Sequence, residues 1–446
     1  MTPRRPPRPN RPAAPAPQAE GEHVDGMRAR QAAMRLVQAA LERRSGFEEA
    51  CADRAFTALD PRDRGFARAL ALATLRRLGA IDAMLAARME RTPPLAVSQL
   101  LRIGLAQMLA MDTPDFAAVS STVMLAEREQ ATRPYKGLIN AVLRGLARDP
   151  ITPDPATYAP PWLMARWRAS YGDETATAIA ASIPHEPPTD LSLRGDADAT
   201  ALAVELEGEL LPGGSLRTPR RGDVAEWPRF DDGSWWVQDA AAAVPGRLLA
   251  PRAGEAILDL CAAPGGKTLQ LAATGATVTA VDRSASRLRR LKANLERTGL
   301  AAEVVVADGE KWQDEREFDA VLLDAPCSAT GTFRRHPDVL WASRPGDVSK
   351  LADVQHRLLD AAARRVRPGG RLVYCVCTLE REEGEGQIQA FLRRTAGFHL
   401  DAADPTAVGA PAEAASSEGW LRILPSHWAE KGGLDGFFVA RMTREG

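Results

Sequence analysis

Apolar residues between Arg28 and Asp149 recur at steps of three and four residues, the period of an amphipathic helix. Pro93-Pro94 and Asp112-Thr113-Pro114 separate the stripes, because the residue before a proline is disfavoured in helical conformation. The pattern predicts an all-α bundle over residues 26–149. The stripes are Ala33, Leu36, Val37, Ala40 and Leu41; Leu78, Ile81 and Leu85; Leu101, Leu105, Met108 and Leu109; Val119 and Val123; and Leu138, Val142, Leu143 and Leu146.

The regions on either side of this bundle lack such a period. Residues 1–25 are rich in Pro, Arg and Ala, and they bury too little apolar surface to offset the entropy of ordering. We therefore predict a disordered tail there. Residues 150–245 are interrupted by proline pairs and contain several tryptophans, which predicts a small α+β connector.

From Ala256 onward, short apolar runs alternate with helical segments. Such alternation predicts a doubly wound parallel sheet with helices on both faces. A late antiparallel hairpin, 421–424 with 437–441, brings the total to about seven strands, and we assign 246–446 to one α/β domain. The other candidate strands are 256–260, 277–281, 303–306, 318–323 and 371–376, and the candidate helices begin at 266 or cover 284–298, 347–366 and 387–394.

The composition is typical of a globular protein, with 45% apolar and 26% charged residues. At roughly 150 residues per domain, 446 residues accommodate two or three domains. Five cysteines, an odd and sparse set, favour a reducing compartment over a disulfide framework. No apolar run approaches about 18 residues, and the chain begins with prolines rather than a signal core. We expect a cytoplasmic monomer with no membrane segment and no metal.

Two of the cysteines, Cys327 and Cys377, each follow a predicted strand of the α/β domain. In an open parallel sheet, ligands bind beyond the carboxyl ends of the strands, so both thiols are placed to face a substrate. One buried cysteine taken alone is more often a small core residue. Two at neighbouring strand ends favour a chemical role.

The turn after the first strand of this domain is Cys261-Ala262-Ala263-Pro264-Gly265-Gly266-Lys267. It is not a P-loop, because Cys261 stands where a glycine is required, and it lacks the spaced glycines of a dinucleotide site. A ligand with an adenosine group but no phosphate fits better. Asp282 and Asp308 close the next two strands, where carboxylates can accept from the ribose hydroxyls and the adenine amine. We therefore predict S-adenosylmethionine as the cofactor.

A methyl donor beside two thiols indicates methylation of a poorly nucleophilic carbon, namely carbon 5 of a pyrimidine. A thiolate that adds to carbon 6 makes carbon 5 nucleophilic; after methyl transfer, a base removes the carbon 5 proton and the thiolate leaves. One cysteine attacks in this scheme, and the other helps to resolve the adduct.

Several motifs carry a family resemblance. The segments 258–268, 324–331 (Asp324-Ala325-Pro326-Cys327-Ser328-Ala329-Thr330-Gly331) and 334–338 together resemble the Sun-type RNA cytosine-5 methyltransferases. Residues 137–144 in the helical region resemble the NusB RNA-binding domain. The resemblance covers nearly everything after the tail. It implies a NusB-like bundle followed by a Rossmann-like class I methyltransferase domain that methylates cytosine carbon 5 in 16S ribosomal RNA.

The resemblance also implies residue roles. Cys377 is the expected nucleophile, Cys327 promotes release, and Asp324 contacts the cytosine. Val376 stands where the family usually has threonine, and Cys375 is an additional thiol that is either a neighbour of the site or plain packing. The expected cofactor contacts are Cys261, Ala262, Ala263, Pro264, Gly265, Gly266, Lys267, Asp282, Arg287, Asp308 and Asp324.

RNA hides its base edges in duplexes, so the target must be single-stranded or flipped, with cations holding its phosphates. Arg334, Arg335 and Arg194 are the expected RNA contacts. Three alternatives stay open: a non-catalytic factor that binds ribosomal RNA during assembly, a cytosine-5 methyltransferase for another RNA, and a DNA cytosine methyltransferase with Cys327 as nucleophile. The presence of both cysteines and of the cofactor acids favours the enzyme over the assembly factor.

Overall fold

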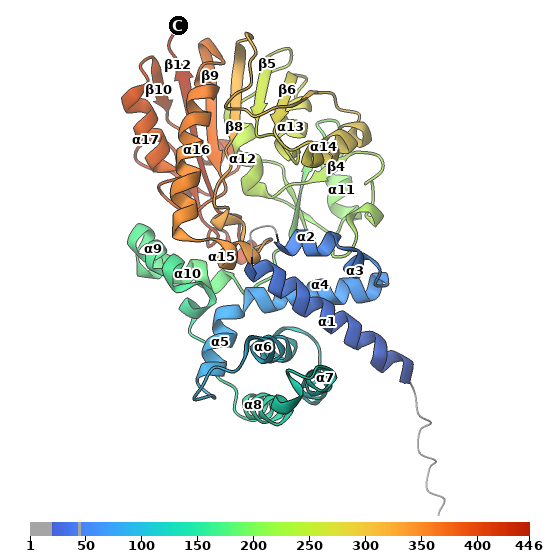
Figure 1. Cartoon of the computed structure of the whole chain (residues 1–446). Helices are drawn as coiled ribbons and strands as arrows, with labels where there is room; N and C mark the ends of the chain where they lie inside the picture. Colours follow the sequence, from blue (N-terminus) through green and yellow to red (C-terminus); the bar gives the residue numbers. More distant parts are fainter. Residues whose placement is uncertain (1–19, 43–45) are drawn as a thin grey trace, which may run out of the picture.

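The computed structural model describes residues 20–42 and 46–446 (Figure 1). Most of the predicted tail, residues 1–19, lies outside this part of the chain. Helix α1 begins at Glu20, which is before the expected end of the tail at residue 25. Within the described ranges, no helix is both long enough and apolar enough to cross a membrane.

The predicted helical bundle is confirmed, and most of the apolar stripes form its single core. Leu109 and Leu138 are exceptions, with 43% and 38% of their surface exposed. Asp60 caps one helix by accepting from the backbone N–H of Asp63, and Pro61 supplies the fixed φ suited to the first helical position. The helices are α1 (Glu20–Glu42), α2 (Gly46–Ala52), α3 (Arg54–Thr57), α4 (Pro61–Arg76), α5 (Leu78–Ala86), α6 (Leu95–Ala110), α7 (Asp115–Arg128) and α8 (Lys136–Arg148).

The connector has the predicted α+β character. Its four strands form an antiparallel sheet in the order β2-β3-β1-β4. Trp167, Trp227, Trp235 and Trp236 are buried, so these tryptophans serve packing rather than base stacking. The elements are α9 (Pro161–Tyr171), α10 (Asp173–Ser182), β1 (Thr189–Leu193), α11 (Ala199–Glu205), β2 (Glu209–Leu210), β3 (Leu216–Thr218) and β4 (Trp235–Val237).

The C-terminal domain is a mostly parallel sheet in the order β10-β12-β9-β8-β5-β6-β7, with β11 paired to β12. Strands β7, β6, β5, β8 and β9 are mutually parallel, and the predicted late hairpin of β11 and β12 is confirmed. Strand β10 was not predicted. The strands are β5 (Ala256–Leu260), β6 (Thr277–Asp282), β7 (Glu303–Val306), β8 (Phe318–Asp324), β9 (Val366–Val376), β10 (Phe398–Asp401), β11 (Leu421–Ile423) and β12 (Phe437–Arg444).

Helices cover both faces of this sheet, and each face has its own apolar core. Figure 1 shows α16 and α17 in front of one face. The short helix α15 lies below the sheet and contacts α1 and α4, so the methyltransferase-like domain rests on the helical bundle (Figure 1). These helices are α12 (Ala240–Leu249), α13 (Gly266–Ala272), α14 (Ala285–Thr298), α15 (Asp338–Ala342), α16 (Pro345–Ala363) and α17 (Glu385–Arg394).

Candidate active site

The two strands that lead to the candidate cysteines lie side by side and run parallel, so their carboxyl ends reach the same edge of the sheet. In this register, Asp324 at the end of β8 pairs with Cys375 in β9. Cys327 and Cys377 follow just beyond, and their Sγ atoms are 3.5 Å apart. The structure therefore brings together the two thiols that the sequence placed at neighbouring strand ends.

Asp324 lies between a lysine and the third cysteine. Lys267 Nζ donates to its Oδ2 at 2.8 Å, and Cys375 Sγ donates to its Oδ1 at 3.4 Å. Burial alone would lower the pKa of Lys267, but the Asp324 carboxylate raises that pKa above its ordinary value. Lys267 is therefore a permanent cation in the site. Cys375, whose role was open, is a fully buried donor to Asp324.

The two paired thiols differ in accessibility. Cys327 is buried, with 8% of its surface exposed, whereas Cys377 is only partly buried. The hydrogen bond with Cys377, together with burial and the nearby Glu383, raises the pKa of Cys327 well above its ordinary value. Cys327 is therefore a thiol at neutral pH. Cys377 is the more exposed member of the pair, and access is one requirement for a reactive cysteine.

The predicted cofactor turn joins β5 to α13 with an unusual backbone. Cys261 has φ +63° and Gly265 has φ +109°. A side chain at Gly265 would also collide with Leu291, because a Cβ atom there would come within 2.4 Å of its side chain. Glycine is thus required at position 265 for both backbone conformation and close packing. Gly266 begins α13.

Three carboxylates flank this turn. Buried Asp259 accepts from Thr268 Oγ1 at 2.6 Å, and burial raises its pKa to about 7. Asp282 accepts from the backbone N–H groups of Ala263 at 3.1 Å and Ser284 at 2.8 Å. Asp308 is exposed, and it accepts from the N–H of Glu310 at 3.1 Å. Asp282 thereby ties the end of β6 to the cofactor turn.

This donor set fits S-adenosylmethionine. The parallel order β8-β5-β6-β7 places Asp324, the turn, Asp282 and Asp308 along one edge of the sheet. Among the described residues, the buried Oδ1 of Asp259 has no hydrogen-bond partner, so the turn retains a polar atom that a ligand could contact. Arg287 donates to the carbonyl oxygen of Ala263 and so braces the turn.

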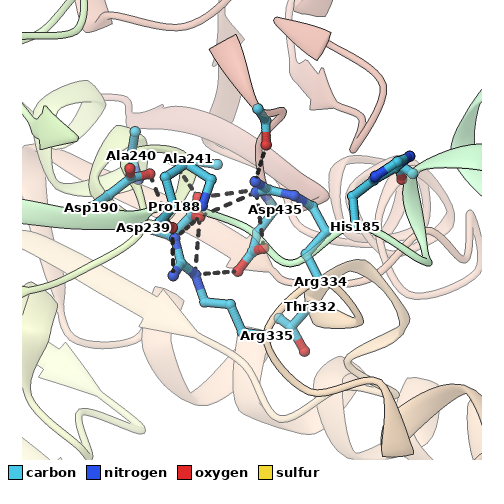
Figure 2. Close-up of polar contacts among 12 residues, drawn as sticks. His185, Pro188, Asp190, Asp239, Ala240, Ala241, Thr332, Arg334, Arg335 and Asp435 are labelled. Atoms are coloured by element: carbon cyan, nitrogen blue, oxygen red, sulfur yellow. Dashed lines mark hydrogen bonds and ion pairs between the residues drawn. The ribbon is translucent and has the colours of Figure 1, made fainter. Parts of the chain in front are cut away.

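The structure corrects the expectation that Arg334 and Arg335 hold RNA phosphates (Figure 2). Arg334 is 2% exposed and lies 3.6 Å from Asp239 and 3.5 Å from Asp435. Arg335 Nη2 is 2.7 Å from an Asp239 oxygen and 3.6 Å from Asp190. Both charges are paired with carboxylates inside the protein, which closes Arg334 to an external phosphate and leaves 21% of the Arg335 side chain exposed. We call Asp190, Arg217, Asp239, Arg334, Arg335 and Asp435 the arginine–aspartate cluster.

Arg194 also has internal partners. It is 2.5 Å from an Asp196 oxygen, and its Nη1 donates to the carbonyl oxygens of Asp232 and Thr298. Its side chain is 30% exposed, so part of it still faces solvent. These contacts hold the connector against α14, and the predicted RNA contact of Arg194 stays a prediction.

Sequence reasoning missed a second set of polar residues around the thiols. Ser328 and Thr378 directly follow Cys327 and Cys377, and both hydroxyls donate to the buried carboxylate of Glu383. Three glutamates, Glu380, Glu382 and Glu383, follow the second cysteine in the sequence. Nothing in the sequence distinguishes the two buried carboxylates, Glu380 and Glu383, from Glu382, whose side chain is 55% exposed.

The site can now be compared with known proteins. Residues 246–443 match the family model described as 16S rRNA methyltransferase RsmB/F, and residues 27–148 match the NusB family. Ribosomal RNA small subunit methyltransferase B of Xylella fastidiosa (strain Temecula1) is 37% identical over 439 residues, which is 94% of this chain and 99% of that protein. The protein of the same name from Vibrio cholerae is 34% identical over 412 residues, or 86% of this chain and 90% of its own.

Solved structures agree with these matches. The crystal structure of PH0851 has a TM-score of 0.74 and 26% identity, and the match covers 94% of this chain and 98% of that one. A methyltransferase homologue from Pyrococcus horikoshii, with a TM-score of 0.53 and 26% identity, covers 68% of this chain and 98% of its own. The predicted fold class and cofactor are confirmed. The chain belongs to the ribosomal RNA small subunit methyltransferase B family, in which a NusB domain precedes an S-adenosylmethionine-dependent methyltransferase domain.

Proposed function

We propose that this protein transfers a methyl group from S-adenosylmethionine to carbon 5 of a cytosine in 16S ribosomal RNA, through a covalent bond between Cys377 and carbon 6. The observation that carries the proposal is the 3.5 Å separation of the Cys327 and Cys377 sulfurs beside Asp324. Membership of the ribosomal RNA small subunit methyltransferase B family supports the choice of RNA.

The cofactor supplies an electrophilic methyl group. The turn at Gly265, with Asp282 and Asp308, would hold it at the carboxyl ends of β5 to β7. The hydrogen bond from Lys267 holds the Asp324 carboxylate, which in this proposal accepts from the amino group of the cytosine.

The covalent steps use the two cysteines in turn. The thiol proton of Cys377 passes to solvent as Sγ adds to carbon 6, the electron pair of the carbon 5–carbon 6 double bond takes the methyl group at carbon 5, and S-adenosylhomocysteine would leave. The carbon 5 proton then passes to solvent, the carbon 6–sulfur bond breaks, and the double bond re-forms. Cys327 is a buried thiol in contact with the departing sulfur, so it assists release by donating a hydrogen bond to it.

Trapping with 5-fluorocytosine RNA tests this assignment, because fluorine replaces the carbon 5 proton that must leave before the carbon 6–sulfur bond can break, so the adduct stays intact. We expect wild-type protein to form the adduct and Cys377→Ala to lose both adduct and turnover. Cys327→Ala should still attack but release slowly, so that an adduct accumulates even on ordinary RNA. The matched control is Cys51→Ala, which removes a thiol of the helical domain instead.

Two outcomes would reject the proposal. An adduct that persists in Cys377→Ala and disappears in Cys327→Ala would exchange the two roles, as in the DNA-type alternative. A protein that binds unmodified small-subunit RNA without transferring any methyl group would be an assembly factor. Bisulfite sequencing of the ribosomal RNA from a deletion strain identifies the target base.

A further inference from the structure

Glu383 is a fully buried carboxylate that joins the two cysteine loops. Its Oε1 accepts from the backbone N–H of Ser328 at 2.8 Å and from Gln355 Nε2 at 3.1 Å. Its Oε2 accepts from Thr378 Oγ1 at 2.7 Å and from the hydroxyl of Ser328. Since Ser328 follows Cys327 and Thr378 follows Cys377, a single side chain connects the residues next to both thiols.

Further bonds close the same network. The hydroxyls of Ser328 and Thr378, whose protons both point to Glu383, lie 2.8 Å apart, and the hydroxyl of Thr330 donates to that of Thr378 at 3.1 Å. Tyr374 at the end of β9 donates its hydroxyl to the Glu383 carbonyl oxygen at 2.6 Å. Four donors thus surround the carboxylate, two on each oxygen. Burying a carboxylate is costly unless it is hydrogen-bonded in this way.

We propose that Glu383 is a positioning residue that clamps the loops after β8 and β9 together and so holds the Cys327 and Cys377 sulfurs in contact. Its effect on catalysis rests on the proposed function, whereas the clamp itself does not. A displacement of about 1 Å between reacting groups can cost about 10²-fold in rate, so a clamp of this kind has a measurable effect. The negative charge of Glu383 also contributes to the raised pKa of Cys327, after the hydrogen bond with Cys377 and burial.

The test compares Glu383→Ala and Glu383→Gln with Glu382→Ala, a neighbouring carboxylate whose side chain is 55% exposed. Serine and threonine hydroxyls can accept as well as donate, so glutamine preserves the bridge and alanine removes it. The first measurement is kcat together with KM for S-adenosylmethionine. The second is the affinity of phenylarsine oxide, a trivalent arsenical that bridges two neighbouring thiols, with the bridged peptides mapped by mass spectrometry.

We expect Glu383→Ala to lower kcat about 100-fold with KM for the cofactor within about twofold, since only the thiols move. Capture of Cys327 and Cys377 by the arsenical should weaken at least tenfold. Glu383→Gln should recover the arsenical affinity and most of the turnover, and Glu382→Ala should match wild type in both measurements. This recovery by glutamine separates positioning from a general loss of folding.

The proposal fails if Glu383→Ala retains both the kcat and the arsenical affinity of wild type. If that variant does not fold, Ser328→Ala removes the hydroxyl link alone, and wild-type behaviour of Ser328→Ala in both measurements would also reject the clamp. The arsenical binds without any methylation, so it judges the clamp even if trapping shows no cytosine adduct. A failed trap with intact arsenical results would reject the proposed function and leave the clamp standing.

Discussion

Two buried polar clusters both include residues of the loop after β8. They differ in whether any of their polar groups can still contact a ligand. In the thiol site, Cys377 is only partly buried, and Asp324 is held by Lys267 while its side chain is 31% exposed. In the arginine–aspartate cluster, Arg334 and Arg335 form ion pairs with carboxylates inside the protein. Residue type alone therefore does not separate a reactive site from a structural one.

The arginine–aspartate cluster supports the thiol site. Asp190 and Arg217 belong to the connector sheet, Asp239 caps α12, and Asp435 precedes β12. The cluster joins these elements to the loop that begins at Cys327. A ladder of backbone hydrogen bonds then reaches Cys377, the proposed nucleophile, because Gly436 donates to the carbonyl of Gly331 and Gly331 donates to the carbonyl of Cys377. The arginines thus contribute to the site by fixing its scaffold.

Arg335→Ala gives the largest expected effect on this comparison. Removing one partner of a buried ion cluster leaves carboxylates without compensation, so we expect a loss of about 3–5 kcal/mol in the free energy of unfolding. Urea denaturation measures it. Arg289→Ala, on the exposed face of α14, is the control and should change stability by about 0.5 kcal/mol or less.

The same variant also decides between the two interpretations of this arginine. If Arg335→Ala is stable and the salt dependence of its RNA binding falls by about one phosphate contact, then Arg335 binds an RNA phosphate. Unchanged salt dependence in the folded fraction, with reduced stability, supports the buried cluster.

The sequence predicts the thiol site well and the arginine cluster poorly, for a physical reason. Neighbouring parallel strands end at the same edge of a sheet, so the residues that follow β8 and β9 lie close together. The proximity of the two cysteines could therefore be predicted from the sequence alone. Arg334 pairs instead with Asp435, about a hundred residues away, and with Asp239, which belongs to another element. Contacts of that kind depend on how the connector docks, which no local period or motif encodes.

Burial also determines the protonation of Asp259, the buried carboxyl group beside the cofactor turn. Burial is the main cause that raises the pKa of Asp259 to about 7. The negative charges of Asp324 and Asp282 raise this pKa further, whereas the hydrogen bond from Thr268 and the charge of Lys267 lower it. The folded protein therefore holds this proton more tightly than the unfolded chain. The associated stability is complete below about pH 4 and is lost as the pH rises through about 7.

Asp259→Asn removes this dependence. Between pH 5 and pH 8, the wild type should lose about 2 kcal/mol more of its free energy of unfolding than the variant does. Thermal denaturation across that range measures the difference. Thr268→Val removes the bond that lowers the pKa, so it should move the wild-type transition to higher pH. Parallel pH profiles for wild type and Asp259→Asn would show that burial does not hold a proton on this carboxyl.

The smallest effect concerns the link from the loop after β8 to the helical bundle. Trp341 in α15 donates its indole N–H to the carbonyl oxygen of Leu75 in α4 at 2.9 Å. Trp341→Phe keeps an aromatic ring but removes the donor, so we expect a loss of about 1 kcal/mol. Trp341→Leu also removes ring packing and should cost more. If the bond holds the bundle in register with the thiols, KM for RNA rises in Trp341→Phe while arsenical capture of Cys327 and Cys377 stays at its wild-type level. Weakened capture in Trp341→Phe would mean instead that the bundle shapes the thiol site itself, and that the arginine–aspartate cluster alone does not fix it.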